Sequence, residues 1–145
     1  MAGCDDYPQM ALIFTGPVTR YDDVPSIPLI VRHGQAGNDV QIEAYIDTGA
    51  DGTLLDETIA QALGIDLSAG NPARVRGVGG GFLSGRMALI ELVFEREETL
   101  IVPVVATFAA GVLESVGNLL GLDVWTALDL GLSHSTRSVY LGLPR

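Results

Sequence analysis

The residues best suited to chemistry lie in one short segment, where an aspartate directly follows an apolar run. Residues 44–46 are strand-like, and Asp47, Thr48 and Gly49 come next. Because glycine permits a sharp turn, this order presents a carboxylate at a strand end. Two such loops meeting face to face hold two carboxylates around one water and share one proton, since like charges that close cannot both ionise. One carboxylate then takes the proton of the water while its protonated partner polarises a peptide carbonyl.

The elements that must position this segment are predicted to be mostly β. Strand-like runs at 27–31 and 40–46 flank a polar stretch with strong turn chemistry, which predicts a hairpin leading into Asp47. Further extended runs cover residues 74–78, 82–94, 99–107 and 138–143.

Two short helices are expected. The first covers residues 56–64, with Asp56 capping its first turn and Gly64 at its left-handed exit, and the second covers residues 124–128. Regular structure is expected to begin near Ile27. Residues 1–26 mix short apolar pieces with prolines and paired aspartates, which favours an N-terminal arm or edge strand ahead of one domain at 27–145.

Three segments, taken in order, resemble the retroviral-type (retropepsin-like) family of single-lobe aspartic proteases. Residues 47–55 are similar to the active-site segment of that family, and residues 76–82 to the glycine-rich tip of its flap hairpin. Residues 118–124 are similar to the apolar-apolar-glycine stretch that supports the catalytic loop. The resemblance covers most of residues 40–130. It implies a closed β-barrel with a flap hairpin and an aspartic endopeptidase that uses no metal and no organic cofactor.

The resemblance also assigns roles to single residues. It implies that Asp47 is the catalytic carboxylate and that Thr48 locks the two active-site loops across a dimer. Because the chain has one Asp-Thr-Gly, a second copy must supply the other carboxylate, and a C2 homodimer acting on a peptide or protein substrate follows. The active-site loop and dimer lock would comprise Thr48, Gly49 and Ala50, and the substrate-binding residues would be Asp51, Gly77, Val78 and Gly79.

The chain departs from the family pattern in ways that bear on activity. Leu122 stands where viral members usually have an arginine that pairs with the residue matching Asp51. Either Asp51 has another partner, for which Arg74 and Arg76 are the candidates if the fold brings them near, or the dimer contacts differ. This departure supports an alternative function, a non-catalytic peptide-binding or dimerisation module of the same fold. Ala50 stands where some members have a serine that donates to the catalytic carboxylate and favours its ionised form. A less acidic pH optimum is therefore expected here.

Composition excludes several other classes of protein. The formal net charge of -10 repels phosphate backbones, so a nucleic-acid partner is not expected. All eight basic residues are arginines, which excludes chemistry that needs a lysine. No apolar run approaches the ~20 residues of a membrane span. The start at Cys4 resembles a lipoprotein cleavage box, but the apolar segment that precedes such a box is missing. The sequence therefore does not decide between bacterial cytoplasm and periplasm.

Other interpretations of the same residues are weaker or stay open. A phosphatase loop would need its nucleophile at Gly49, and a calcium loop would need a glutamate at Thr58. His33 and His134 are interpreted as separate surface imidazoles, so no metal site is expected. The glycines at 79–81 are also compatible with a plain hairpin turn. Residues 108–112 suit either a substrate subsite or a packed loop.

Overall fold

The computed structural model describes residues 14, 16–34, 38–77, 80–96 and 98–144. Strands dominate these residues, which confirms the predicted mostly-β fold. The strands are β1 (Thr19–Arg20), β2 (Ser26–Arg32), β3 (Val40–Ile46), β4 (Leu54–Asp56), β5 (Pro72–Arg76), β6 (Phe82–Phe94), β7 (Leu100–Ala109), β8 (Leu119–Leu120), β9 (Asp129–Ser133) and β10 (Ser138–Gly142). The helices are α1 (Glu57–Ala62), η2 (Leu67–Ala69), α2 (Val112–Ser115) and α3 (Leu122–Trp125). None of the helices in the described part of the chain is long and apolar enough to cross a bilayer.

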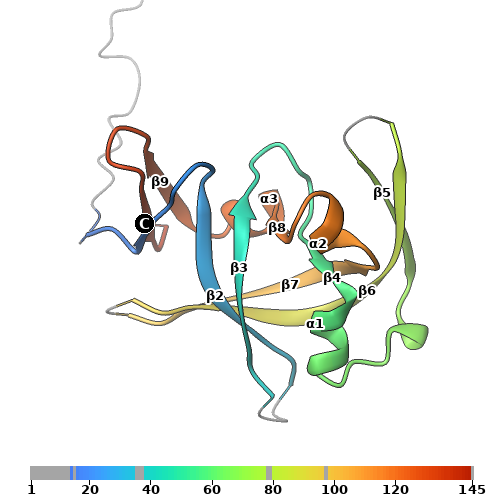
Figure 1. Ribbon diagram of the computed structural model, residues 1–145. Coiled ribbons are helices and arrows are strands. Elements are labelled where there is room, and N and C mark those ends of the chain that lie inside the picture. Colours follow the sequence, from blue (N-terminus) through green and yellow to red (C-terminus); the bar gives the residue numbers. More distant parts are fainter. Residues whose placement is uncertain (1–13, 15, 35–37, 78–79, 97, 145) are drawn as a thin grey trace, which may run out of the picture.

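Seven strands form one sheet in the order β2-β3-β8-β4-β7-β6-β5. Strand β2 also pairs with β6. The strand pairings therefore form a ring, from β2 through β3, β8, β4, β7 and β6 back to β2. Strand β5 lies outside the ring as the partner of β6. Figure 1 shows this hairpin rising at the right of the molecule. The predicted hairpin at 27–46 is confirmed as the antiparallel pair of β2 and β3.

The two longest strands, β6 and β7, contribute many of the core residues. In β7, buried and exposed residues alternate from Leu100 to Ala106, as expected for a sheet with one face on the core. Phe94 at the end of β6 packs against Trp125 of α3, with ring centroids 6.4 Å apart. Apolar burial on this face stabilises the sheet that carries the active-site strand.

A second, three-stranded sheet has the order β1-β10-β9 and holds the N-terminal part of the described chain. Thr19 and Arg20 pair with Val139 and Ser138, and the amide of Val18 donates to the Val139 carbonyl at 2.7 Å. The expectation that regular structure begins near Ile27 is therefore wrong, because β10 offers an edge that the earlier segment joins. The division into an arm at 1–26 and a domain at 27–145 stays a prediction.

The first predicted helix is confirmed, and the second is displaced. Asp56 caps α1 by accepting from the Thr58 amide, and Gly64 has a φ of 72°. Helix α3 begins at Leu122, not at residue 124, because the chain turns directly after Gly121. Residues 108–112 are partly packed, since Phe108 and Val112 are fully buried. The chain then forms α2, which the sequence analysis did not predict.

Candidate active site

Asp47 directly follows β3, at the strand end where the sequence analysis expected a carboxylate. Strand β3 runs parallel to β8, with Ile46 beside Leu120, and the Asp47 amide donates to the Leu120 carbonyl at 3.0 Å. On the other side, the Ile46 amide donates to the Pro25 carbonyl at 2.9 Å. The backbone of Asp47 is therefore held by two neighbouring segments.

The loop after Asp47 is tight but leaves the carboxylate accessible. The Gly49 amide donates to Asp47 Oδ1 at 3.0 Å, and the Ala50 amide donates to the Asp47 carbonyl at 3.3 Å. Thr48, Gly49 and Asp51 are exposed, whereas Asp47 is half-buried. In the described part of the chain, the Asp47 carboxylate accepts no other hydrogen bond. Its remaining acceptor positions are free for donors such as a water or a second, protonated carboxyl group.

The turn from β8 into α3 packs against the loop after Asp47. This turn requires glycine at position 121. The Leu122 amide donates to the Ala50 carbonyl at 2.8 Å. A Cβ added to Gly121 would lie 2.5 Å from the Gly52 carbonyl oxygen and 2.8 Å from that of Ala50. Glycine allows the two backbones to approach this closely, so the third predicted segment does lie against the first.

Asp123 is a residue of this site that the sequence analysis missed. Its Oδ1 accepts from the Thr53 hydroxyl at 2.8 Å and its Oδ2 from the Thr53 amide at 3.0 Å. The same hydroxyl lies 3.4 Å from the amide nitrogen of Gly121. Asp123 thus ties the end of the Asp47 loop to α3. The only local signal was an acidic residue two positions after a turn glycine, and its partner is 70 residues away.

The structure does not give Asp51 either of the arginine partners that the sequence analysis considered. Arg32 and Asp39 form an ion pair at 3.2 Å, far along the β2–β3 hairpin from this loop. Arg74 instead lies over the ring of Phe82, with its guanidinium carbon 4.5 Å from the centroid. Leu122 is 38% exposed. Among the described residues, neither Arg74 nor Arg76 pairs with Asp51.

The predicted flap segment lies at the tip of the β5–β6 hairpin. The Gly77 amide donates to the Gly81 carbonyl at 2.7 Å, which closes the turn beyond the paired residues Arg76 and Phe82. Val78 and Gly79, two of the predicted substrate-binding residues, lie outside the described residues. Figure 1 shows this tip and the loop after β3 both at the top of the view.

A second aspartate close to this site has a contrasting environment. Asp56 is 3% exposed, and its carboxylate accepts from the Thr58 amide and hydroxyl and from the Val112 amide at 3.1, 2.6 and 3.1 Å. The Leu113 amide donates to it at 3.3 Å. Burial alone would raise the pKa of Asp56, but the hydrogen bonds from Thr58, Leu113 and Val112 outweigh it and lower that pKa. Asp56 therefore joins the starts of α1 and α2 as a charged structural group.

Of two comparisons with solved structures, the first supports the assignment of the fold. A retropepsin-like aspartic protease from Rickettsia conorii superposes with a TM-score of 0.53 at 17% identity, covering 81% of this chain and 92% of that chain. EIAV protease complexed with the inhibitor HBY-793 gives a TM-score of 0.43 at 16% identity, covering 72% and 88%. The comparison with curated protein sequences gives no match. A family model described as Aspartyl protease matches residues 33–124, more than half of the chain. The chain therefore belongs to the aspartyl protease family and has the retropepsin-like fold.

Proposed function

We propose that this chain is a homodimeric aspartic endopeptidase, which hydrolyses peptide bonds with a water activated between two Asp47 carboxylates, one from each subunit. The observation that carries the proposal is the state of the Asp47 carboxylate. It stands at a strand end, half-buried, and accepts one hydrogen bond among the described residues. The other acceptor positions of the Asp47 carboxylate are free for a water and for a second, protonated carboxyl group.

The reaction follows from two such groups sharing one proton. The ionised carboxylate takes a proton from the water, whose oxygen attacks the peptide carbonyl carbon, while the protonated carboxyl donates a hydrogen bond to the carbonyl oxygen. The tetrahedral intermediate then collapses, the C–N bond breaks, and the nitrogen leaves with a proton from the dyad. The Gly49 amide, 3.0 Å from Oδ1, keeps the carboxylate oriented through these steps.

The surrounding residues have proposed roles of their own. Thr48 locks the two active-site loops across the two-fold axis, Gly49 and Ala50 complete the loop, and Asp51 contacts the substrate backbone. Gly77, Val78 and Gly79 form the flap tip that covers the peptide and excludes water, which strengthens the electrostatics of the dyad. The homodimer is required because the chain contains one Asp-Thr-Gly.

One observation favours a second candidate function. Asp51 is exposed and, in the part of the chain that the structure describes, has no ion-pair partner. A loop that has lost this restraint also suits a non-catalytic module that binds peptides or dimerises. The two functions share the fold and differ in whether peptide bonds are broken.

A cleavage assay on a mixed peptide library separates the two functions. The native chain and Asp47→Asn are incubated side by side over a wide pH range, and products are identified by mass spectrometry. Cleavage by the native chain that disappears in Asp47→Asn supports the endopeptidase. Absence of cleavage by a preparation shown by sedimentation to be dimeric supports the binding module. A chain that sediments as a monomer at every concentration contradicts the shared dyad.

A further inference from the structure

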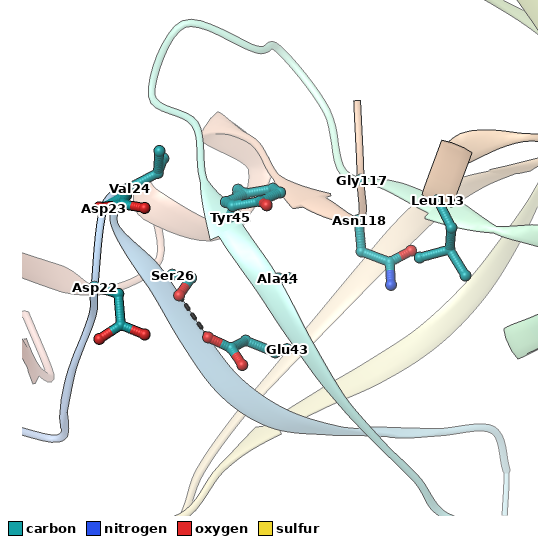
Figure 2. Close-up of a pocket in the computed structure, with 10 residues that line it drawn as sticks. All are labelled: Asp22, Asp23, Val24, Ser26, Glu43, Ala44, Tyr45, Leu113, Gly117 and Asn118. Carbon is teal, nitrogen blue, oxygen red and sulfur yellow. Dashed lines mark hydrogen bonds between the residues drawn. The ribbon is translucent and has the colours of Figure 1, made fainter. Parts of the chain in front are cut away.

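A cavity of about 530 Å³ lies beside the active-site strand, outside the residues assigned above. Its walls come from three separate parts of the chain: the segment that leads into the start of β2, the last half of β3, and α2 with the connection from α2 to β8. Figure 2 shows Tyr45 of β3 on one side of it and Leu113 of α2 on another.

The cavity is close to Asp47 because the last residues of β3 form part of its wall. Tyr45 lines it and precedes Asp47 by two positions, so the two side chains leave the chain on the same side and their Cα atoms are about 7 Å apart. Directly before the neighbouring strand β8, Asn118 lines the cavity and its carbonyl accepts from the Tyr45 amide at 2.8 Å. A peptide bound across Asp47 would place a neighbouring residue at this cavity.

The cavity wall is acidic and contains no basic side chain. Asp22, Asp23 and Glu43 contribute three carboxylates, and none of them forms an ion pair with another described residue. Glu43 is fixed by the Ser26 hydroxyl, which donates to its Oε1 at 2.6 Å, as the dashed line in Figure 2 shows. Arg137 is bound to the backbone carbonyl of Asp22, not to a carboxylate. The negative charge of the cavity is therefore left for a ligand.

A buried amide supplies an independent sign of a ligand. Asn118 is 7% exposed, and its Oδ1 accepts from the Asp56 amide at 2.8 Å. Its Nδ2 donates to no described residue. Because no fully buried side-chain nitrogen or oxygen among the described residues lacks a partner, Nδ2 must be open to the cavity that Asn118 lines. The cavity thus offers a hydrogen-bond donor on Asn118 and carboxylate acceptors on Asp22, Asp23 and Glu43.

We propose that this cavity binds a basic residue of the peptide substrate, arginine or lysine, next to the bond that is cleaved. The Asn118 amide donates to a backbone carbonyl of the peptide, and the cationic group of the side chain binds the carboxylates of Asp22, Asp23 and Glu43. The aliphatic stem packs on Tyr45 and Leu113, which are 43% and 56% exposed. The proposal rests on the endopeptidase function proposed above.

The arrangement fits an extended organic cation better than a metal ion. Among the described residues, no group of three or more histidine, cysteine, aspartate or glutamate side chains is close enough to hold a metal. The three carboxylates are spread along the wall of the cavity. A guanidinium with five donors, or an ammonium with three, can reach separated acceptors.

Two peptides that differ at one position test the proposal. A sequence cleaved from the library is made with arginine next to the scissile bond and again with citrulline, which keeps the shape and removes the charge. We expect the native chain to favour the arginine peptide in kcat/KM by about tenfold. The triple variant Asp22→Asn, Asp23→Asn, Glu43→Gln should lose most of that ratio. Glu98→Gln, an exposed acid in the β6–β7 turn outside the cavity, should keep it.

A binding measurement keeps this test separate from catalysis. A library peptide that binds Asp47→Asn is made with arginine and again with citrulline at the same position, and the two forms are titrated into Asp47→Asn and followed by fluorescence anisotropy at low and high salt. Tighter binding of the arginine peptide that weakens with salt supports the cavity even if the native chain cleaves nothing, an outcome that would count against the endopeptidase alone. Cleavage of both peptides at equal rates, or equal binding of both, overturns the basic-residue proposal.

Discussion

Asp47 and Asp56 are nine positions apart and have opposite environments. Asp56 is buried and its carboxylate accepts four hydrogen bonds, from Thr58, Val112 and Leu113. Asp47 is half-buried and its carboxylate accepts one, from Gly49. A carboxylate whose acceptor positions are filled by its own chain is a structural group, whereas one whose positions are empty is available to water, a partner and a substrate.

The largest expected effect comes from the available carboxylate. Asp47→Asn should reduce peptide cleavage by at least about 10³-fold, because an amide cannot take a proton from water. The free energy of unfolding should change by less than about 1 kcal/mol, since the asparagine Oδ1 can still accept from Gly49. Steady-state kinetics and thermal denaturation measure the two quantities. Wild-type cleavage by the variant would remove Asp47 from the mechanism.

For Asp56, the structural carboxylate, a substitution should act on the stability of the fold. Asp56→Ala should lower the free energy of unfolding by about 3 kcal/mol, because the buried Val112 amide and the cap of α1 both lose their acceptor. Asp66→Ala is a matched control, since Asp66 caps η2 with the Ser68 amide at 3.1 Å but is exposed. It should cost about 1 kcal/mol or less. If urea denaturation gives equal losses in the free energy of unfolding for Asp56→Ala and Asp66→Ala, the burial of Asp56 does not add to the stability.

The pH dependence of stability sharpens the same contrast. The hydrogen bonds of Asp56 outweigh the raising effect of burial and lower its pKa, so the folded state binds its proton more weakly than the unfolded chain does. The resulting stabilisation is complete above the unfolded pKa of about 3.9 and is lost as the pH falls through the lower folded pKa. The stability gap between the native chain and Asp56→Asn should therefore narrow below about pH 4. A gap that stays constant to pH 2 would contradict the charged state of Asp56.

The smallest effect is expected beside Asp47. Ala50→Ser adds a hydroxyl that can donate to one of the empty acceptor positions and favour the ionised form. The acidic limb of the pH–rate profile should move to lower pH by less than about one unit, with the maximal rate little changed. An unchanged profile would show that the hydroxyl does not reach the carboxylate.

The parts of the fold that local patterns specify were predictable. The β2–β3 hairpin, the Asp47 turn and the cap of α1 each depend on residues within a few positions, and all three are present. Strands β4 and β8 were not predicted. They have three and two residues, and their partners lie elsewhere in the sequence: Leu54 pairs with Leu119 and with Thr107.

The site was predictable to the same extent. The place of Asp47 at a strand end and the turn at Gly121 against its loop were predicted, because a resemblance in sequence order carries them, whereas the roles of these residues stay predictions. Asp123 was missed because its partner, Thr53, lies 70 residues away along the chain. Asp56 was recognised only as the cap of α1, because its contact with Val112 spans 56 residues. The acidic cavity was also missed, since it assembles from three segments that no local pattern joins.

Asn118 has a consequence for experiments that observe backbone amides. Its carbonyl binds the Tyr45 amide, its side-chain oxygen binds the Asp56 amide, and its nitrogen faces the cavity. Hydrogen exchange at Tyr45 and Asp56 therefore depends on the same residue. A peptide that engages the Asn118 nitrogen should slow exchange at both amides together, although they belong to β3 and β4. Such paired protection would report occupancy of the cavity without any bond being cleaved.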